Sequence, residues 1–386
     1  MAATLLPLLL FLAAAAANPA PASACFSSIF SFGDSISDTG NYLISCGATP
    51  DPVGQSPYGQ TFFHRPTGRC SDGRLIVDFL AQALGLPLVP PYLSGETSPE
   101  GANFAVAGCT ALDNDFFRSL GLEISWRNYS LGVQMEWFQQ LLPSIFSSSS
   151  ECRNLMADSL FLVGEIGGND YCHSLLQGRA VEEVKAFVPD VISAISSAIT
   201  ELIRLGARTL VVPGGVTFGC LPILLDHFRS KDAGDYEPET GCLKFLNRFS
   251  EHHNELLLRE LNQIRQANPD ATIIYADYYN AMVAIYRNPR RYGFSRSPLV
   301  ACCGGGGQYN FNASALCGDE AVTACRDPAE HISWDGMHFT EAGYRAVTSE
   351  LLGRWTEPSL AQICPQIDAN FLQGIHASIF KSLGHE

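Results

Sequence analysis

The sequence predicts an α/β fold, a three-layer α/β/α sandwich around a central, mostly parallel sheet of five strands. Two observations predict it. Short apolar runs alternate with longer helical patterns along the whole chain, which is typical of a parallel sheet covered by helices on both faces. Hydrophobic residues make up 46% of the 386 and charged residues 16%, which is enough apolar material for a large core.

Five buried strands are predicted, and most of them end at a glycine. The strands are residues 26–32, 102–107, 159–163, 209–212 and 271–275. The first ends at Gly33, the second at Gly108 and the third at Gly164. The helical patterns lie near 74–84, 133–147, 181–205, 243–267 and 340–355. The pattern at 181–205 has apolar residues at three- and four-residue steps, and Pro189 is expected to kink it.

Residues 1–24 are expected to be a signal peptide and not part of the fold. The apolar run 5–17 is too short to cross a bilayer comfortably, and the small residues 22–24 suit a cleavage site. An uncleaved membrane anchor is the alternative, and no basic residue precedes the run. No second stretch is expected to span a membrane. Residues 25–386 are therefore predicted to form one domain, soluble in the secretory pathway or outside the cell.

The 13 cysteines, all in the predicted mature chain, fit an oxidising compartment in which most are paired. The odd number leaves at least one outside an intramolecular disulfide, and spacing does not give the connectivity. Gly, Pro and Cys concentrate in 41–70 and 289–330, which are expected to be loops pinned by disulfides. No metal is expected, because no Cys-x-x-Cys pair has a matching second pair or His ligands. Asn128 and Asn312 stand in Asn-x-Ser triplets and are candidate glycosylation sites.

The charge balance disfavours some partners. Lys and Arg number 24 against 39 Asp and Glu, a formal net charge of −15. Nucleic acids and anionic membranes need clustered cations, and the longest cationic cluster, 287–291, is short and interrupted. A neutral or cationic small molecule or an uncharged polysaccharide fits better. The oligomeric state stays open.

Polar residues set among glycines follow three of the predicted strands, at 33–35, 108–110 and 167–170. In an open parallel sheet, ligands bind at the carboxyl ends of the strands. An ordinary turn explains each segment taken alone, because turns prefer the same residues. Three such segments at one edge of one sheet indicate a functional site.

Ser35 is the candidate nucleophile of this site. A serine alcohol is a poor nucleophile unless a base, typically a histidine positioned by an acid, takes its proton. Asp335 and His338 are three residues apart at a turn before a predicted helix, so the carboxylate can hold the imidazole while the other ring nitrogen faces Ser35. The alternative is an exposed turn in which Asp335 caps the helix.

Acyl transfer also needs donors aimed at the developing oxyanion. The candidates are the backbone N–H of Ser35, the backbone N–H of Gly108 and the side-chain amide of Asn169. The sequence lacks Gly-x-Ser-x-Gly, His-Glu-x-x-His, the phosphate-binding Gly-x-x-x-x-Gly-Lys and Gly-x-Gly-x-x-Gly. No cofactor is therefore expected.

The sequence resembles the GDSL esterases/lipases of plants, within the SGNH hydrolase superfamily. Four blocks in the family's order carry the resemblance: FGDSISDTGN at 32–41, GANFAVAG at 101–108, GEIGGND at 164–170 and WDGMHFTE at 334–341. The resemblance implies an SGNH-hydrolase-like fold and the same roles for the five candidate residues. Ile36 stands where leucine is usual. Cys109 stands where a smaller residue is common, and a packing role is expected for it.

Residues 58–74, YGQTFFHRPTGRCSDGR, resemble a branch of this family that includes esterases of choline esters, alkaloid acetates and acetylated xylan. The resemblance implies a secreted carboxylic-ester hydrolase, of the apoplast or the Golgi lumen, that acts through a Ser-His-Asp acyl-enzyme. Its expected substrates are short-chain, acetyl esters of a cell-wall polysaccharide or a small plant metabolite. Two alternatives stay open: a non-catalytic glycan- or ester-binding protein, and a transacylase that uses the same residues.

Overall fold

The computed structural model describes residues 25–96, 98–124, 128–145, 148–365 and 367. The predicted signal peptide, residues 1–24, lies outside the described residues. The strands are β1 (Ser28–Phe32), β2 (Gly101–Asn103), β3 (Ser159–Val163), β4 (Thr209–Pro213), β5 (Thr272–Ala276) and β6 (Thr356–Glu357). The helices are α1 (Asn41–Cys46), α2 (Ile76–Ala83), α3 (Asn114–Ser119), α4 (Leu131–Ile145), α5 (Ser149–Asp158), α6 (Gly168–Leu176), α7 (Val181–Lys185), α8 (Val188–Leu205), α9 (Pro222–His227), α10 (Lys244–Ala267), α11 (Tyr278–Arg287), α12 (Glu341–Gly353) and α13 (Leu360–Ile363).

The strands form one sheet in the order β2-β1-β3-β4-β5-β6. Strands β1 to β5 are mutually parallel, which confirms the predicted mostly parallel sheet. The prediction of five strands is wrong by one, because β6 pairs antiparallel with the end of β5, Thr356 opposite Ala276. A strand of two residues shows no alternation or apolar run, so its sequence carries no strand signal.

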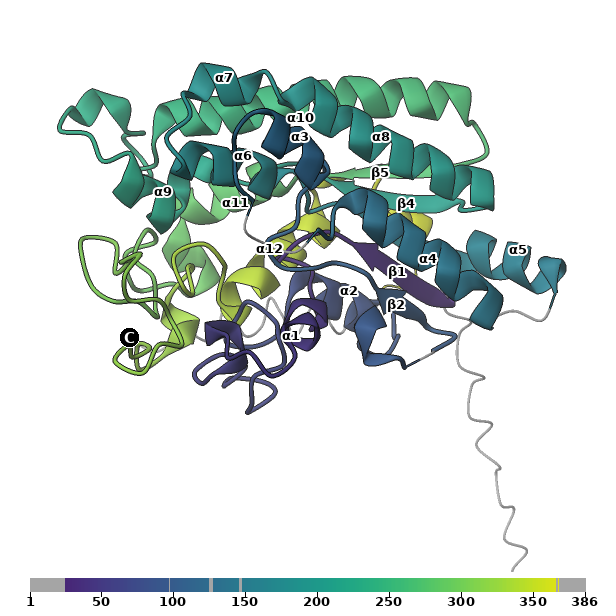
Figure 1. The fold of residues 1–386 in the computed structure, drawn as a ribbon, viewed down its shortest axis with the longest axis horizontal. Helices are drawn as coiled ribbons and strands as arrows, with labels where there is room; N and C mark the ends of the chain where they lie inside the picture. Colours follow the sequence, from purple (N-terminus) through teal and green to yellow (C-terminus); the bar gives the residue numbers. More distant parts are fainter. Residues whose placement is uncertain (1–24, 97, 125–127, 146–147, 366, 368–386) are drawn as a thin grey trace, which may run out of the picture.

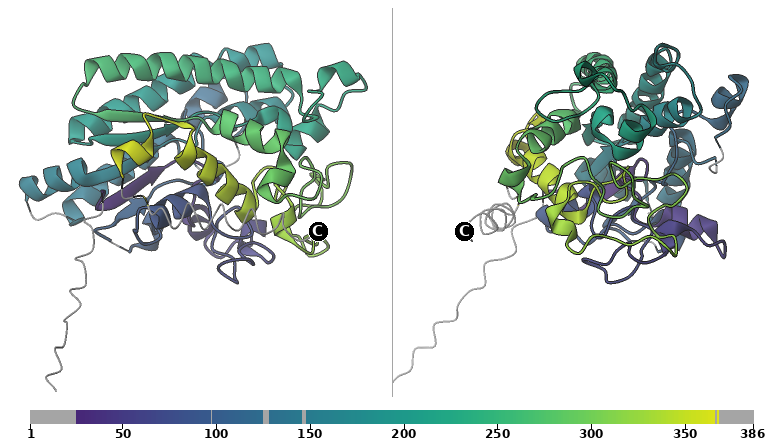
Figure 2. Two further views of the ribbon diagram at one scale, coloured as in Figure 1. Left: turned by 180° about the vertical axis from the view of Figure 1, so that it is seen from behind. Right: turned by 90° about the vertical axis from the view of Figure 1, so that its left-hand side faces the viewer.

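Helices cover both faces of the sheet (Figures 1 and 2), which gives the three layers. In one layer α8 packs between α4 and α10, and in the other α12 packs against α2 and α11. Phe138 of α4 makes edge contacts with Phe30 and Phe32 of β1 and with Phe161 of β3. These rings are fully buried and pack α4 against β1 and β3.

Residues 181–205 form two helices, α7 and α8, and not one kinked helix. Pro189 stands in the first turn of α8, where its missing N–H costs no helical hydrogen bond. An 18-residue window within Val181–Leu205 has a mean hydropathy of 1.5, so by length and composition alone the segment passes as a membrane span, although no such stretch was expected. In this fold α8 buries Val191, Ile195 and Ile199, so covering the sheet accounts for its apolar character.

Eight cysteines form four disulfides: Cys25–Cys364, Cys220–Cys242, Cys302–Cys325 and Cys303–Cys317. Two of them pin the 289–330 loop, as predicted. The 41–70 loop is held differently from the prediction, because its Cys70 is a buried thiol. There Arg69 makes a two-pronged salt bridge to Asp78 of α2, with both N–O distances 2.8 Å. Buried charge pairing therefore replaces the expected covalent link.

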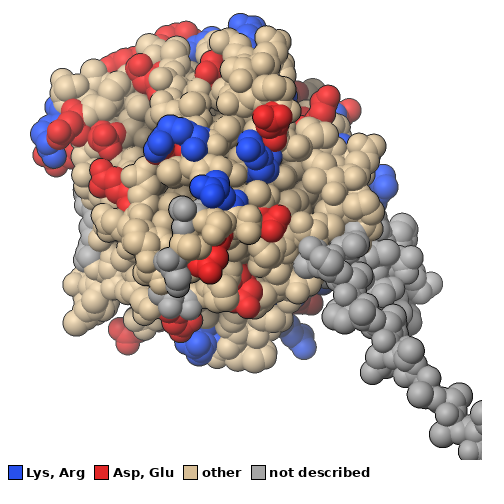
Figure 3. Space-filling model, turned by 90° about the vertical axis from the view of Figure 1, so that its right-hand side faces the viewer, with Lys and Arg blue, Asp and Glu red and all other residues tan. Residues whose placement is uncertain are grey.

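The carboxyl ends of the parallel strands point towards the side of the molecule where α6, α9 and the 289–330 loop lie, at the left of Figure 1. The opposite side shows cationic and anionic side chains interspersed among uncharged residues (Figure 3).

Candidate active site

Ser35 lies just past β1, at the point where the strand order reverses between β1 and β3. The chain turns there at Gly33, whose φ is +150°. A Cβ on Gly33 would lie 2.5 Å from the carbonyl oxygen of Gly164 at the end of β3, so only glycine fits. This close approach of the two strand ends holds the Asp34-Ser35 turn at the carboxyl edge of the sheet.

Asp335 and His338 lie on a tight loop that closes just before α12. The backbone N–H of Trp334 donates to the carbonyl of His338 at 2.8 Å. The Oδ1 atom of Asp335 accepts the backbone N–H groups of Met337 (3.0 Å) and His338 (2.8 Å). Thr340, not Asp335, caps α12 through its side-chain oxygen. The alternative in which Asp335 serves only as a helix cap is therefore wrong.

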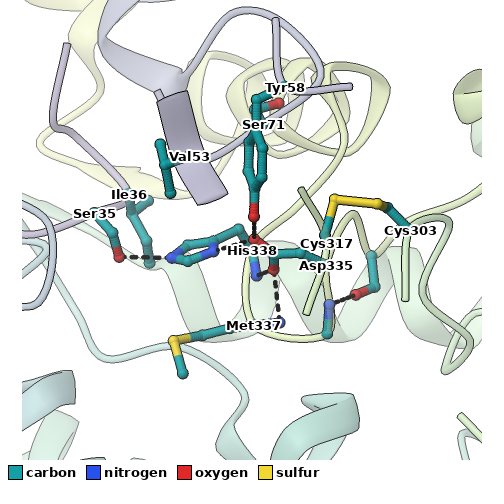
Figure 4. Close-up of polar contacts among 12 residues, drawn as sticks. Ser35, Ile36, Val53, Tyr58, Ser71, Cys303, Cys317, Asp335, Met337 and His338 are labelled. Carbon is teal, nitrogen blue, oxygen red and sulfur yellow. Dashed lines mark hydrogen bonds and ion pairs between the residues drawn. A yellow bond between two sulfur atoms is a disulfide. The ribbon is translucent and has the colours of Figure 1, made fainter. Parts of the chain in front are cut away.

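The loop brings the predicted acid and base to Ser35 (Figure 4). The Nε2 atom of His338 lies 2.7 Å from Ser35 Oγ, across a sequence separation of 303 residues. The Nδ1 atom of His338 lies 2.7 Å from Asp335 Oδ2. Both separations are normal for strong hydrogen bonds, so a proton can pass between the hydroxyl and the imidazole.

Burial and charge set the protonation of the pair. Burial alone would raise the pKa of Asp335, but the charge of His338 and the hydrogen bonds to the carboxylate lower it to about 2. Burial opposes the imidazolium of His338, yet the Asp335 carboxylate and the nearby Cys70 thiol raise the pKa of His338 well above its ordinary value. Asp335 is therefore a fixed anion that makes His338 a stronger base.

Two backbone N–H groups at the site are free to meet an oxyanion. Within the part of the chain that the structure describes, neither Ser35 N–H nor Gly108 N–H donates to a protein acceptor. Gly108 has φ +80°, a conformation that favours glycine. The amide of Asn169, on the first turn of α6, donates to the carbonyl of Cys109 at 2.9 Å and lies 3.5 Å from Asp34 Oδ2. Asn169 therefore contacts Asp34, which precedes Ser35, and Cys109, which follows Gly108.

Gln134 of α4 joins the β1 end to the loop after β2, and the sequence did not point to it. Its Oε1 accepts the backbone N–H of Gly33 (2.9 Å), and its Nε2 donates to the carbonyl of the same residue (2.9 Å). The Nε2 atom also lies 3.0 Å from the sulfur of Cys109, whose thiol donates to Gly33 O. Gln134 is fully buried. Cys109, for which packing was expected, is buried and also takes part in this contact.

A second residue missed by the sequence is Tyr58, whose hydroxyl donates to Asp335 Oδ2 at 2.9 Å. A third is Asp34, a buried carboxyl beside Ser35. Burial raises the pKa of Asp34 to about 7, against the lowering effect of the hydrogen bond from Ile36 N–H. No local pattern signals either role, because each depends on partners distant in the sequence or on burial.

The remaining histidines lie outside the triad. His253 of α10 is buried, and its Nδ1 lies 2.8 Å from the Tyr171 hydroxyl. Among the described residues, the one group with metal-ligand spacing is Cys302, Cys325 and His331. Its two sulfur atoms form a disulfide, so they are not thiolate ligands.

The structure describes both candidate glycosylation positions. Asn128 and Asn312 are both exposed and outside helices and strands. Their side chains are accessible to a modifying enzyme, as a sugar acceptor must be.

The fold and the Ser-His-Asp arrangement define the class of this protein, the serine ester hydrolases. The model of the GDSL-like lipase/acylhydrolase family matches residues 29–351, and the chain belongs to this family. A GDSL esterase/lipase of Arabidopsis thaliana is 50% identical over 330 residues, which are 85% of this chain and 84% of that protein. A sinapine esterase of Brassica napus is 46% identical over 353 residues, 90% of this chain and 91% of that protein.

Among solved structures, an α/β hydrolase enzyme from the metagenome of Lake Arreo, Spain, aligns with 12% identity and a TM-score of 0.36. The alignment covers 85% of this chain and 96% of that one. A likeness at this level carries no argument about function.

Proposed function

We propose that this protein is a secreted carboxylic-ester hydrolase that forms an acyl-enzyme on Ser35. His338 serves as general base and acid, Asp335 orients it, and Ser35 N–H, Gly108 N–H and the Asn169 amide hold the oxyanion. The observation that carries the proposal is the unbroken hydrogen-bond line from Ser35 Oγ to His338 and on to Asp335, with both links at 2.7 Å.

In the acylation step, Ser35 Oγ attacks the ester carbonyl while its proton moves to Nε2 of His338. The negative charge that develops on the carbonyl oxygen is stabilised by the three donors. The tetrahedral intermediate collapses as the bond to the alcohol oxygen breaks, and His338 gives its proton to the leaving alcohol. Asp335 stays ionised throughout and stabilises the transient imidazolium.

In the deacylation step, water occupies the place left by the alcohol. His338 takes a proton from the water, the resulting hydroxide attacks the acyl carbonyl, and the bond to Ser35 breaks with return of the proton to Oγ. The products are a carboxylic acid and the free enzyme. A transacylase would differ only in using a second alcohol in place of water.

We propose short acyl esters, acetyl esters above all, as the substrates, carried by a cell-wall polysaccharide or a small plant metabolite. The branch resemblance of residues 58–74 and the relative named sinapine esterase support small esters. Acetate release from a panel of acetylated xylans, choline esters and aryl acetates tests this choice. A clear preference for long-chain acyl esters in the same panel would refute it.

We propose that residues 25–386 form one domain, exported after removal of residues 1–24 and glycosylated at Asn128 and Asn312. Four disulfides support an oxidising compartment. The exposure of both asparagines supports glycosylation.

Ser35→Ala tests the mechanism. Hydrolysis of p-nitrophenyl acetate is expected to fall at least about 10³-fold, because the nucleophile is lost while the fold is kept. Ser37→Ala is the matched control, since the Ser37 hydroxyl donates to Glu165 at 2.8 Å and not to His338.

A fluorophosphonate probe separates the enzyme from a non-catalytic binding protein, because labelling needs an activated serine. Labelling of the wild type and the control, but not of Ser35→Ala, is expected. Undiminished hydrolysis by Ser35→Ala would refute the assignment. Release of free acid in water, compared with transfer to an added alcohol, distinguishes the hydrolase from the transacylase.

A further inference from the structure

Residues 58–74, the segment that resembles one branch of the family, lie against the loop that carries Asp335 and His338. The Asp72 carboxylate accepts the backbone N–H of Glu341 at 2.7 Å, at the first residue of α12. Arg74 binds the Glu341 carboxylate twice, through its backbone N–H (2.9 Å) and its guanidinium (2.7 Å). A Cβ on Gly73 would lie 2.0 Å from Glu341 Oε2, so the Glu341 side chain lies directly against the backbone of Gly73.

This segment, which we name the 58–74 strap, is itself well anchored. Gly59 N–H donates to Ser71 O at 3.0 Å, which joins its two ends. The Thr61 hydroxyl donates to the Asp72 carboxylate, and Arg69 is locked to Asp78 of α2. The strap is therefore a rigid support fixed both to α2 and to the start of α12.

Tyr58 is the residue through which the strap contacts the triad (Figure 4). Its ring is 4% exposed and packs edge-on against Trp334, with a centroid distance of 5.8 Å. Its hydroxyl donates to Asp335 Oδ2, the same oxygen that receives His338 Nδ1–H. Oδ1 already accepts two backbone N–H groups, so Asp335 accepts four hydrogen bonds in all. A carboxylate has about four lone-pair sites, and the carboxylate is therefore fully satisfied.

We propose that Tyr58 is a positioning residue of the triad, held on the 58–74 strap so that its hydroxyl orients Asp335 and limits how strongly Asp335 attracts the imidazole proton. The inference deepens the proposed hydrolase function and rests on it. Tyr58 touches no reacting atom and acts only through Asp335.

The sign of the effect follows from charge. The Tyr58 hydroxyl withdraws negative charge from Oδ2, so its removal leaves a more basic carboxylate that holds the His338 proton more tightly. The imidazole then stays protonated to higher pH, and the acidic limb of the pH–activity profile moves to higher pH. The ionisable groups that face the Asp335–His338 pair are Tyr58 and Cys70 of the strap, Asp34 after β1 and Tyr344 of α12. Tyr58→Phe changes only the first of them.

Tyr58→Phe is the test, because it keeps the ring that packs on Trp334. The matched control is Tyr292→Phe, which removes a Tyr hydroxyl bonded to Glu350 at 2.8 Å, away from the triad. The dependence of kcat/KM on pH for p-nitrophenyl acetate is measured per active site, counted with the fluorophosphonate probe. For Tyr58→Phe, kcat is expected to fall about tenfold with little change in KM. The acidic limb of the pH dependence of kcat/KM is expected to move to higher pH by about half a unit. The control is expected to match the wild type.

A purely structural role would lower the yield of active enzyme but leave the pH profile of each active site unchanged. A Tyr58→Phe profile and kcat that coincide with the wild type would therefore overturn the proposal. If Tyr58→Phe does not fold, 3-fluorotyrosine placed at position 58 gives the opposite test. Its more acidic hydroxyl is a stronger donor, so the acidic limb is expected to move to lower pH, and an unmoved limb would overturn the proposal.

Failure of the Tyr58 proposal is distinguishable from failure of the proposed function. In the first case the wild type hydrolyses esters and takes up the probe while Tyr58→Phe behaves as the wild type does. In the second case the wild type itself neither hydrolyses esters nor takes up the probe.

Discussion

Gln134 is the side chain whose removal tests how the core holds the nucleophile. The change is Gln134→Ala. It removes the acceptor of Gly33 N–H and one of the three donors to Gly33 O, while the Val106 N–H and the Cys109 thiol still donate to that carbonyl. One buried N–H is thus left unpaired, two residues before Ser35, and a void opens where the amide was.

The magnitude follows from these losses. An unpaired buried N–H costs roughly 1–3 kcal/mol, and the truncation of a fully buried side chain adds about 1 kcal/mol or more. We therefore expect the free energy of unfolding to fall by about 3 kcal/mol. With an unfolding entropy near 0.7 kcal/mol/K for a chain of this size, the melting temperature falls by about 4 °C. Because Ser35 is displaced relative to His338, kcat is expected to fall about tenfold or more.

Thermal unfolding and kcat for p-nitrophenyl acetate are the measurements. Gln134→Met nearly keeps the volume but leaves Gly33 N–H unpaired, so it separates packing from hydrogen bonding. Gln139→Ala, an exposed position on the same helix, is the matched control and is expected to match the wild type. Wild-type stability and kcat in Gln134→Met would refute the hydrogen-bonding argument, and the same result in Gln134→Ala would refute any role in positioning.

Two further predictions concern the chemistry. Asn169→Ala is expected to lower kcat on p-nitrophenyl acetate by about 10²-fold with little change in KM, because one oxyanion donor is lost. An unchanged kcat would show that Asn169 does not act as an oxyanion donor. Because Asp335 raises the pKa of His338 and only neutral His338 can accept the Ser35 proton, kcat/KM is expected to fall as pH drops through that raised pKa and to persist at alkaline pH. A pH profile with its maximum in the acidic range would contradict this.

Strands β1, β3, β4 and β5 were predictable because each is a short, almost wholly buried run with many apolar residues, whereas β2 is only Gly101–Asn103 and not the predicted 102–107. β3 begins and ends where the sequence predicts, and β1, β4 and β5 lie within about two residues of their predicted bounds. Helix α11 was missed, because it follows β5 after only Asp277 and its ten residues are rich in tyrosine. Local periodicity therefore predicts elements that bury one continuous face, and it fails for short connecting helices.

The candidate triad could be predicted because its residues stand in recognisable blocks, each with its own chemistry. Tyr58 could not, because its partner is 277 residues away and nothing in its surroundings marks a hydrogen bond. Gln134 looks like any polar residue of an amphipathic helix until the structure shows it 0% exposed. The prediction that disulfides pin the 41–70 loop was wrong because Cys70 is a buried thiol, and a buried Arg69–Asp78 pair anchors the loop instead. Tertiary partners, not composition, decide these roles.

The distance along the chain between Ser35 and His338 has a consequence for biosynthesis. A ribosome delivers Ser35 early and His338 only after 303 further residues, so a nascent chain that has not yet reached His338 lacks the proposed base for its serine. The Cys25–Cys364 bond closes later still, over a separation of 339 residues. Ser35 and its proposed base therefore meet only once synthesis is almost complete, and a prematurely terminated polypeptide that ends before His338 lacks the proposed base altogether.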